Sequence, residues 1–115
     1  MADIGKCAFT IFKRGNEFIG KTVGVAGEHL TGTQMANSLT KALGTEVIFN
    51  DIPADVYRGF GFPGAVDMGN MFQFKRDFEE DYCGNRNLKL SWELNPEMLT
   101  FDKWLNINKG LIPLG

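Results

Sequence analysis

The chain has 115 residues, of which 43% are hydrophobic and 23% charged, and twelve basic against fourteen acidic side chains give a formal net charge of -2. This composition is typical of one globular domain over residues 1–115, and the near-balance of charge excludes a general electrostatic attraction to nucleic acid or to an anionic membrane. Two cysteines, and no apolar run of the ~20 residues that cross a bilayer, exclude a disulfide-stapled secreted scaffold and a membrane span, so we expect a soluble cytoplasmic protein that could also enter the nucleus.

Two helices are predicted in the first half of the chain. Apolar side chains recur at helical spacing over residues 3–14, and Asp3 is placed to cap the start of that helix. Thr31 and Gln34 have the spacing of a capping box, in which each side chain accepts a hydrogen bond from the other residue's backbone N–H. The apolar stripe that follows ends at Gly44, a residue type that favours the left-handed conformation of a helix end.

Two runs rich in β-branched residues, 21–25 and 45–50, flank the second predicted helix and predict strands. A strand–helix–strand unit of this length favours parallel pairing of its strands. We therefore expect an α+β fold, with a small and partly parallel sheet covered by four or five helices.

The second half of the chain is predicted to be mainly helical. Residues 53–58 predict a short helix that begins with a proline, and the glycine-rich aromatic loop 59–64 leads into a long helix over 65–81. Thr100 is placed to cap a terminal helix. Before it, residues 88–94 alternate apolar and polar side chains, which is typical of a strand.

The turn at residues 24–32 is a candidate phosphate site, because a glycine-bearing turn joins a predicted strand to a predicted helix, although Gly24 itself lies within that strand. The turn is longer than the tight glycine fingerprint of dinucleotide-binding proteins, and Glu28 occupies space that a phosphate would need. We favour a structural turn here, and an autonomous nucleotide site is the alternative.

Few residues of the chain carry signatures of catalysis or metal binding. His29 is the only histidine, and the chain contains no Cys-x-x-Cys, Gly-x-Ser-x-Gly or His-Glu-x-x-His motif. Gly61 and Arg86 stand four positions after the two tyrosines, so the Tyr-x-x-x-Lys pair of short-chain dehydrogenases is also missing. We expect no catalytic residue and no metal, with Cys7 and Cys83 as free thiols that pack as small apolar groups. A nucleophilic pair of one cysteine with His29 is the alternative.

Aromatic and methionine side chains gather in the middle of the chain more densely than a small core requires. The pattern leaves three interpretations open, namely core, the wall of a pocket, or a surface that binds a partner. The residues that we single out as this pocket or partner surface are Tyr57, Phe60, Phe62, Met71, Phe72 and Phe74.

Four short segments resemble the NmrA-like family, whose members are atypical relatives of the short-chain dehydrogenases/reductases. They are residues 57–65 (YRGFGFPGA), 70–74 (NMFQF), 94–96 (LNP) and 99–105 (LTFDKWL). The first predicted helix and the residues after it also look like the C-terminal half of that family, so the resemblance spans nearly the whole chain.

The resemblance implies that a Rossmann domain preceding this region binds NADP(H), and that a lobe like this chain forms one side of a substrate-like cleft. It implies no cofactor in this chain itself, and a redox-sensing protein that regulates others by binding them rather than by catalysis. It also leaves residues 88–94 open between strand and loop.

We therefore expect a non-enzymatic regulatory or protein-interaction module, and the alternative is a fragment or subunit of an NADP(H)-dependent reductase. Without a nucleotide domain the lobe would expose an apolar face, so we also expect it to form a homo-oligomer or to swap an element with a second copy. The expected ligand is a protein partner, not nucleic acid or a membrane.

Overall fold

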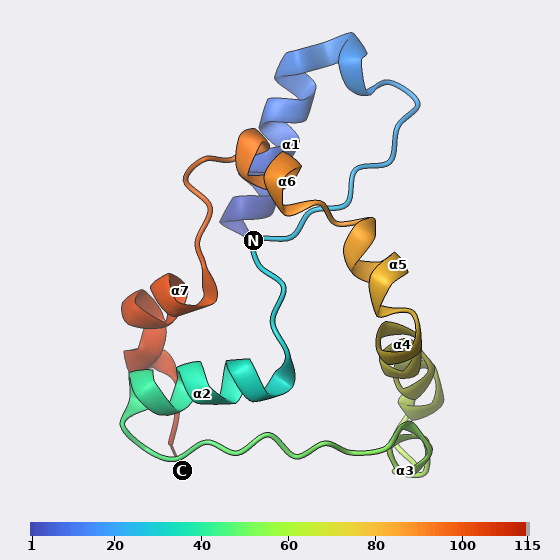
Figure 1. Cartoon of the computed structure of the whole chain (residues 1–115), viewed down its shortest axis with the longest axis vertical. Helices are drawn as coiled ribbons and strands as arrows, with labels where there is room; N and C mark the ends of the chain where they lie inside the picture. The colour runs from blue at the N-terminus through green and yellow to red at the C-terminus, as the bar shows by residue number, and fades with distance from the viewer. Residues whose placement is uncertain (115) are drawn as a thin grey trace. The chain divides into compact units, whose positions relative to one another are not determined.

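The computed structural model describes residues 1–114, and within them the chain forms seven α-helices and two short 3₁₀ helices (Figure 1). These helices belong to two compact units. The first unit consists of Met1–Phe49 together with the described residues from Arg86 on, and the second unit consists of Asn50–Asn85. Each unit is described by itself below.

The predicted α+β fold is wrong, because residues 1–114 contain no strand. Residues 21–25 and 45–50 form no sheet, and side chains take over part of the backbone pairing that a neighbouring strand would supply. The Thr40 hydroxyl accepts a hydrogen bond from the Val47 N–H (2.9 Å) and lies 3.2 Å from the Val47 carbonyl oxygen. The β-branched residues thus indicated a non-helical backbone correctly, but the propensity could not supply a partner strand.

Helix α1 (Ala2–Arg14) confirms the predicted first helix, and Gly15 follows it as the first residue of the 3₁₀ helix η1 (Gly15–Phe18). The packed face of the helix centres on Cys7, which is 1% exposed, and includes Ile11 of the predicted apolar stripe, whereas Ile4 and Phe12 of that stripe are exposed. Asp3 does not cap the helix. Its carboxylate instead accepts hydrogen bonds from the Asn95 side chain (3.3 Å) and from the Leu99 N–H (3.1 Å), which ties α1 to a segment more than ninety residues away.

Helix α6 (Leu88–Leu94) corrects the strand predicted at residues 88–94. The Asn87 side chain accepts a hydrogen bond from the Leu90 N–H (3.0 Å), which is a helix N-cap, and the Ser91 side chain is fully buried. Leu94 is buried on the same helical face, whereas Trp92 is only partly buried. A seven-residue apolar alternation is too short to distinguish a strand from a buried helix.

The core of the first unit forms where α6 packs against α1 (Figure 1). Its fully enclosed members are Cys7, Leu94 and Met98. The partly buried side chains around them come from α1, η1, the extended segment before α2, and α6, and they are Ile11, Phe18, Val23, Val25, Leu90 and Trp92.

Helices α2 (Gly32–Leu43) and α7 (Phe101–Asn108) pack against each other in the same unit, and the 3₁₀ helix η2 (Lys109–Leu111) follows α7. The predicted capping box is confirmed, with the Thr31 hydroxyl accepting from the Gln34 N–H (3.1 Å) and the Gln34 side chain accepting from the Thr31 N–H (2.9 Å). Gly44 ends α2 in the left-handed conformation (φ 69°), and Thr100 caps α7, as predicted.

The second unit contains α3 (Ala54–Arg58), α4 (Ala65–Asp77) and α5 (Glu79–Gly84). Pro53 precedes α3 as its N-cap rather than occupying its first position. The long helix predicted over 65–81 is interrupted at Phe78 (φ -120°, ψ 41°). The three acidic residues directly after the break lie in the first turn of α5, where negative charge is favourable, so this sequence suits a new helix start better than a continuous helix.

The capping box offers a direct test of how α2 is held. We expect Thr31→Ala to lower the free energy of unfolding by about 1 kcal/mol, because the Gln34 N–H loses its partner. For a chain of this size the loss corresponds to a fall of roughly 4–8 °C in the melting temperature, measured by circular dichroism. Thr31→Ser should retain most of the stability, and the exposed Thr33→Ala should change it little. Equal effects of the two alanine variants would contradict the role of the cap.

Candidate functional site: an exposed aromatic cluster

Three phenylalanine rings surround Tyr57 in the second unit. The Tyr57 ring centroid lies 5.3 Å from that of Phe60, 5.8 Å from that of Phe62 and 5.3 Å from that of Phe72. The interplanar angles are 51°, 85° and 77° respectively, which are the tilted and edge-on arrangements that aromatic pairs prefer. We call these four residues the aromatic cluster.

The local sequence explains how the cluster forms. Tyr57 lies near the end of α3, and the loop after it carries two glycines in the left-handed region, Gly61 (φ 76°) and Gly64 (φ 89°). Glycine adopts this conformation without steric cost, so the chain can turn sharply enough to bring both loop phenylalanines against Tyr57. Gly64 is also the N-cap of α4, the helix that supplies Phe72.

The rings contact one another and yet remain accessible to solvent. Phe60 is 50% exposed, Phe62 41% and Phe72 43%, while Tyr57 at the centre is partly buried. The Tyr57 hydroxyl lies 3.9 Å from the sulfur of Met68, which is itself 40% exposed. The cluster is therefore an ordered apolar surface and not part of an enclosed core.

Two of the six residues singled out from the sequence lie elsewhere. Phe74 stacks on Phe78, with ring centroids 5.2 Å apart and an interplanar angle of 22°. Met71 is exposed and makes no ring contact with the cluster. The helical repeat turns positions 71 and 74 of α4 away from the face that carries Phe72, so neither Met71 nor Phe74 reaches Tyr57. Phe74 instead meets Phe78, which follows it by four residues.

Sequence reasoning missed two neighbours of the cluster, Met68 and Lys75. The Lys75 ammonium lies 5.8 Å from the Phe72 ring centroid and 5.1 Å from that of Tyr82, distances typical of cation–π contacts. Both missed residues stand one helical turn from Phe72, at i-4 and i+3, and that spacing is the signal that could have identified them.

A second candidate is an open hollow of about 590 Å³ in the first unit, between α1 and the residues that follow α6. An exposed ion pair, with Lys6 Nζ and Glu97 Oε2 2.7 Å apart, lies on its wall. The hydrogen bond to Glu97 raises the pKa of Lys6, and the hydrogen bond to Lys6 lowers the pKa of Glu97. Each group therefore holds its charge more firmly at neutral pH, which suits an ion pair and not a group that exchanges protons.

Cys7 does not suit the role of a nucleophile. Its thiol is enclosed in the core of the first unit, and burial raises the pKa of Cys7. A reactive cysteine needs a lowered pKa and access to solvent. Its sulfur lies 3.9 Å from the Ser91 carbonyl oxygen, so it packs as a small apolar group with a weak hydrogen bond.

The described residues contain no group of three or more His, Cys, Asp or Glu side chains placed to hold a metal ion. In the same residues, no helix combines the length and the apolar character that crossing a membrane requires.

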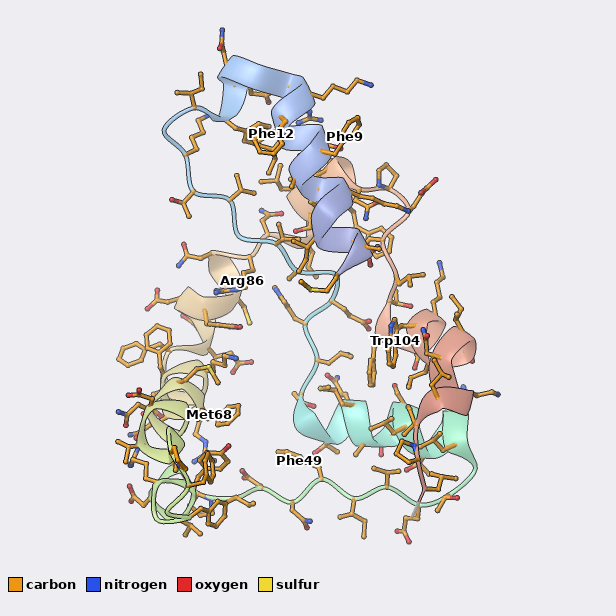
Figure 2. The ribbon with its side chains drawn as sticks, turned by 180° about the vertical axis from the view of Figure 1, so that it is seen from behind. Phe9, Phe12, Phe49, Met68, Arg86 and Trp104 are labelled. Carbon is orange, nitrogen blue, oxygen red and sulfur yellow. The ribbon has the colours of Figure 1, made fainter. Side chains whose placement is uncertain are left out.

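Side chains and their hydrogen bonds occupy the turn at residues 24–32, the candidate phosphate site. A Cβ atom at Gly32 would lie 2.5 Å from the Phe49 ring, so that ring covers the start of α2 where a pyrophosphate would lie (Figure 2). The Gly27 carbonyl accepts a hydrogen bond from the Trp92 indole (2.9 Å), and the Glu28 carboxylate accepts one from the Phe101 N–H (3.0 Å). These contacts support the interpretation of a structural turn.

Comparison of the chain with models of known protein families identifies its family. The model of the NmrA-like family matches residues 1–107 of the 115-residue chain. The chain therefore belongs to the NmrA-like family.

The contacts that occupy the turn at residues 24–32 lead to a testable expectation. Adding NADPH at millimolar concentration should leave the melting temperature of the chain unchanged, because a ligand stabilises a protein only by binding its folded state. Thermal unfolding followed by circular dichroism measures this, with inorganic pyrophosphate at the same ionic strength as the control for nonspecific anion effects. A rise that saturates with NADPH and does not occur with pyrophosphate would overturn the structural interpretation of the turn.

Proposed function

We propose that this member of the NmrA-like family is a non-enzymatic regulatory module that binds other proteins through the aromatic cluster. The observation that carries the proposal is an ordered group of four rings, three of which are between 41% and 50% exposed. Aromatic side chains are enriched in protein interfaces and supply much of their binding energy.

The fixed geometry of the rings supports binding. Binding energy is lost when flexible side chains must be immobilised, and each ring of the cluster already contacts Tyr57 before any partner arrives. A partner that covers the exposed ring faces would gain apolar burial at a small entropic cost. This argument favours an apolar or aromatic segment of a protein as the ligand.

The reductase alternative has no support from the cluster. The Tyr57 hydroxyl faces the thioether sulfur of Met68, which is a weak acceptor and cannot relay a proton. A reductase would need a proton donor aligned with its substrate and dinucleotide. Within this proposal, regulation depends on binding and not on turnover.

We also propose that a second copy of the chain covers the outer face of α1. The inner face of that helix packs on the core through Cys7, whereas Phe9 and Phe12, labelled in Figure 2, are 68% and 82% exposed. They stand three positions apart and so share one face of the helix, and large apolar side chains exposed together favour association. A two-fold contact would pair this face with itself, and the acidic first turn and basic last turn of α1 suit an antiparallel arrangement.

Phe62→Ala tests the aromatic cluster. Peptides selected for binding to the folded chain from a random library serve as the probe, and fluorescence anisotropy measures their Kd. We expect Phe62→Ala to weaken binding about tenfold, a loss of about 1.4 kcal/mol, with little change in the melting temperature, because the ring is exposed. The control is Phe78→Ala, an exposed phenylalanine of the same unit outside the cluster. A larger effect on melting than on binding, or equal losses of binding in both variants, would contradict the proposal.

Light scattering tests the self-association. The expected mass at tens of micromolar is twice the 12.8 kDa of one chain. Phe12→Glu should restore the monomer, because two carboxylates cannot be buried together at a two-fold interface. Ile48→Glu, at another exposed apolar position of the same unit, should leave the mass unchanged. A monomeric wild-type chain across this concentration range would rule out the second copy.

A further inference from the structure

Arg58 connects the two helices that carry Tyr57 and Phe72. One of its guanidinium nitrogens, Nη1, donates to the side-chain oxygens of Gln73 (2.7 Å) and Asn70 (3.2 Å), both on α4. The other nitrogen, Nη2, pairs with Asp55, one turn earlier on α3. The Arg58 side chain is only 24% exposed although it belongs to a short helix in a small unit.

The aliphatic part of Arg58 lies against a glycine. Gly69 is buried in the middle of α4, and a Cβ atom there would come 2.5 Å from Arg58 Cγ and 3.4 Å from the Ala54 carbonyl oxygen. Glycine inside a helix destabilises the helix relative to alanine. At this position it permits a close approach of α3 and α4 with the arginine stem between them.

From these contacts we infer that Arg58 is the positioning residue of the aromatic cluster. Tyr57 is its direct neighbour on α3, and Phe72 stands on α4 between the two amide residues that Arg58 binds. The planar guanidinium holds several acceptors in fixed directions, which a lysine ammonium does not. Arg58 therefore fixes the distance between α3 and α4 at which the Tyr57 and Phe72 rings meet. The positioning role of Arg58 stands on these contacts, and only its expected effect on partner binding rests on the proposed function.

The acceptors on α4 carry this role, and the ion pair does not. The Asp55 side chain is 90% exposed, so water screens its attraction to Arg58 and its contribution is small. The amide oxygens of Asn70 and Gln73 belong to the other helix, so among the hydrogen bonds of the Arg58 guanidinium only these two connect α3 to α4. The two kinds of contact predict different outcomes for substitution.

The experiment combines a structural readout with a binding readout on the full chain. Arg58→Lys retains the charge but loses the planar fork. We expect it to weaken the nuclear Overhauser effect between the Tyr57 and Phe72 rings at least twofold and to raise the Kd of the selected peptides about tenfold, with the helix content unchanged. Asp55→Asn, and Arg76→Lys at the exposed pair with Asp51, should leave both readouts at the wild-type level.

The double variant Asn70→Ala with Gln73→Ala provides a second route, because it removes the acceptors and leaves Arg58 in place. It should reproduce the effects of Arg58→Lys, and it decides the matter if Arg58→Lys fails to fold. Wild-type ring contacts in the double variant, or equal losses in Asp55→Asn, would overturn the positioning role. Loss of ring contacts without any change in peptide binding, together with unchanged binding in Phe62→Ala, would leave Arg58 as the positioning residue and refute the proposed function instead.

Discussion

The buried Ser91 hydroxyl is the interaction on which the first unit depends. It donates to the Asn87 carbonyl within α6 (2.8 Å) and accepts from the Ala26 N–H of the turn (3.1 Å), while the Ser91 carbonyl oxygen lies 3.9 Å from the sulfur of Cys7 on α1. One residue thus joins α6, the turn and α1. A backbone N–H that is partly shielded from water needs a partner, and at Ala26 a side chain supplies the acceptor that a neighbouring strand would supply in a sheet.

This way of satisfying the backbone has a consequence for the surface. A sheet presents continuous rows of apolar side chains that helices can cover. Extended segments held by single side-chain hydroxyl groups present no such rows, and so they bury few apolar side chains. In the first unit few apolar side chains are buried, namely Cys7, Leu94 and Met98 in the core cluster together with Ala36 and Leu105, whereas large apolar side chains on α1, on the 45–50 segment and throughout the second unit remain exposed. Their exposure connects the fold to the proposed role, because such surfaces are where proteins bind one another.

The candidate site was only partly predictable. Tyr57, Phe60 and Phe62 stand within six positions of one another around a glycine loop, so their proximity follows from local sequence. Phe72 rather than Phe74 contacts Tyr57 because of how α4 is rotated about its axis, and that rotation is seen only when the helix packs against α3. The helix pairing also accounts for Gly69, a position that no motif in the sequence marks.

By itself, the sequence determined the helices whose ends are marked by local chemistry. The capping box of α2, its glycine end and the threonine cap of α7 involve residues at most four positions apart, so no distant contact is needed to form them. Tertiary structure decided whether residues 21–25 and 45–50 find a partner strand, and which face of residues 88–94 is buried. Extended segments become strands only when another strand accepts their hydrogen bonds, and a short alternation becomes a helix when a cap and a buried face favour it.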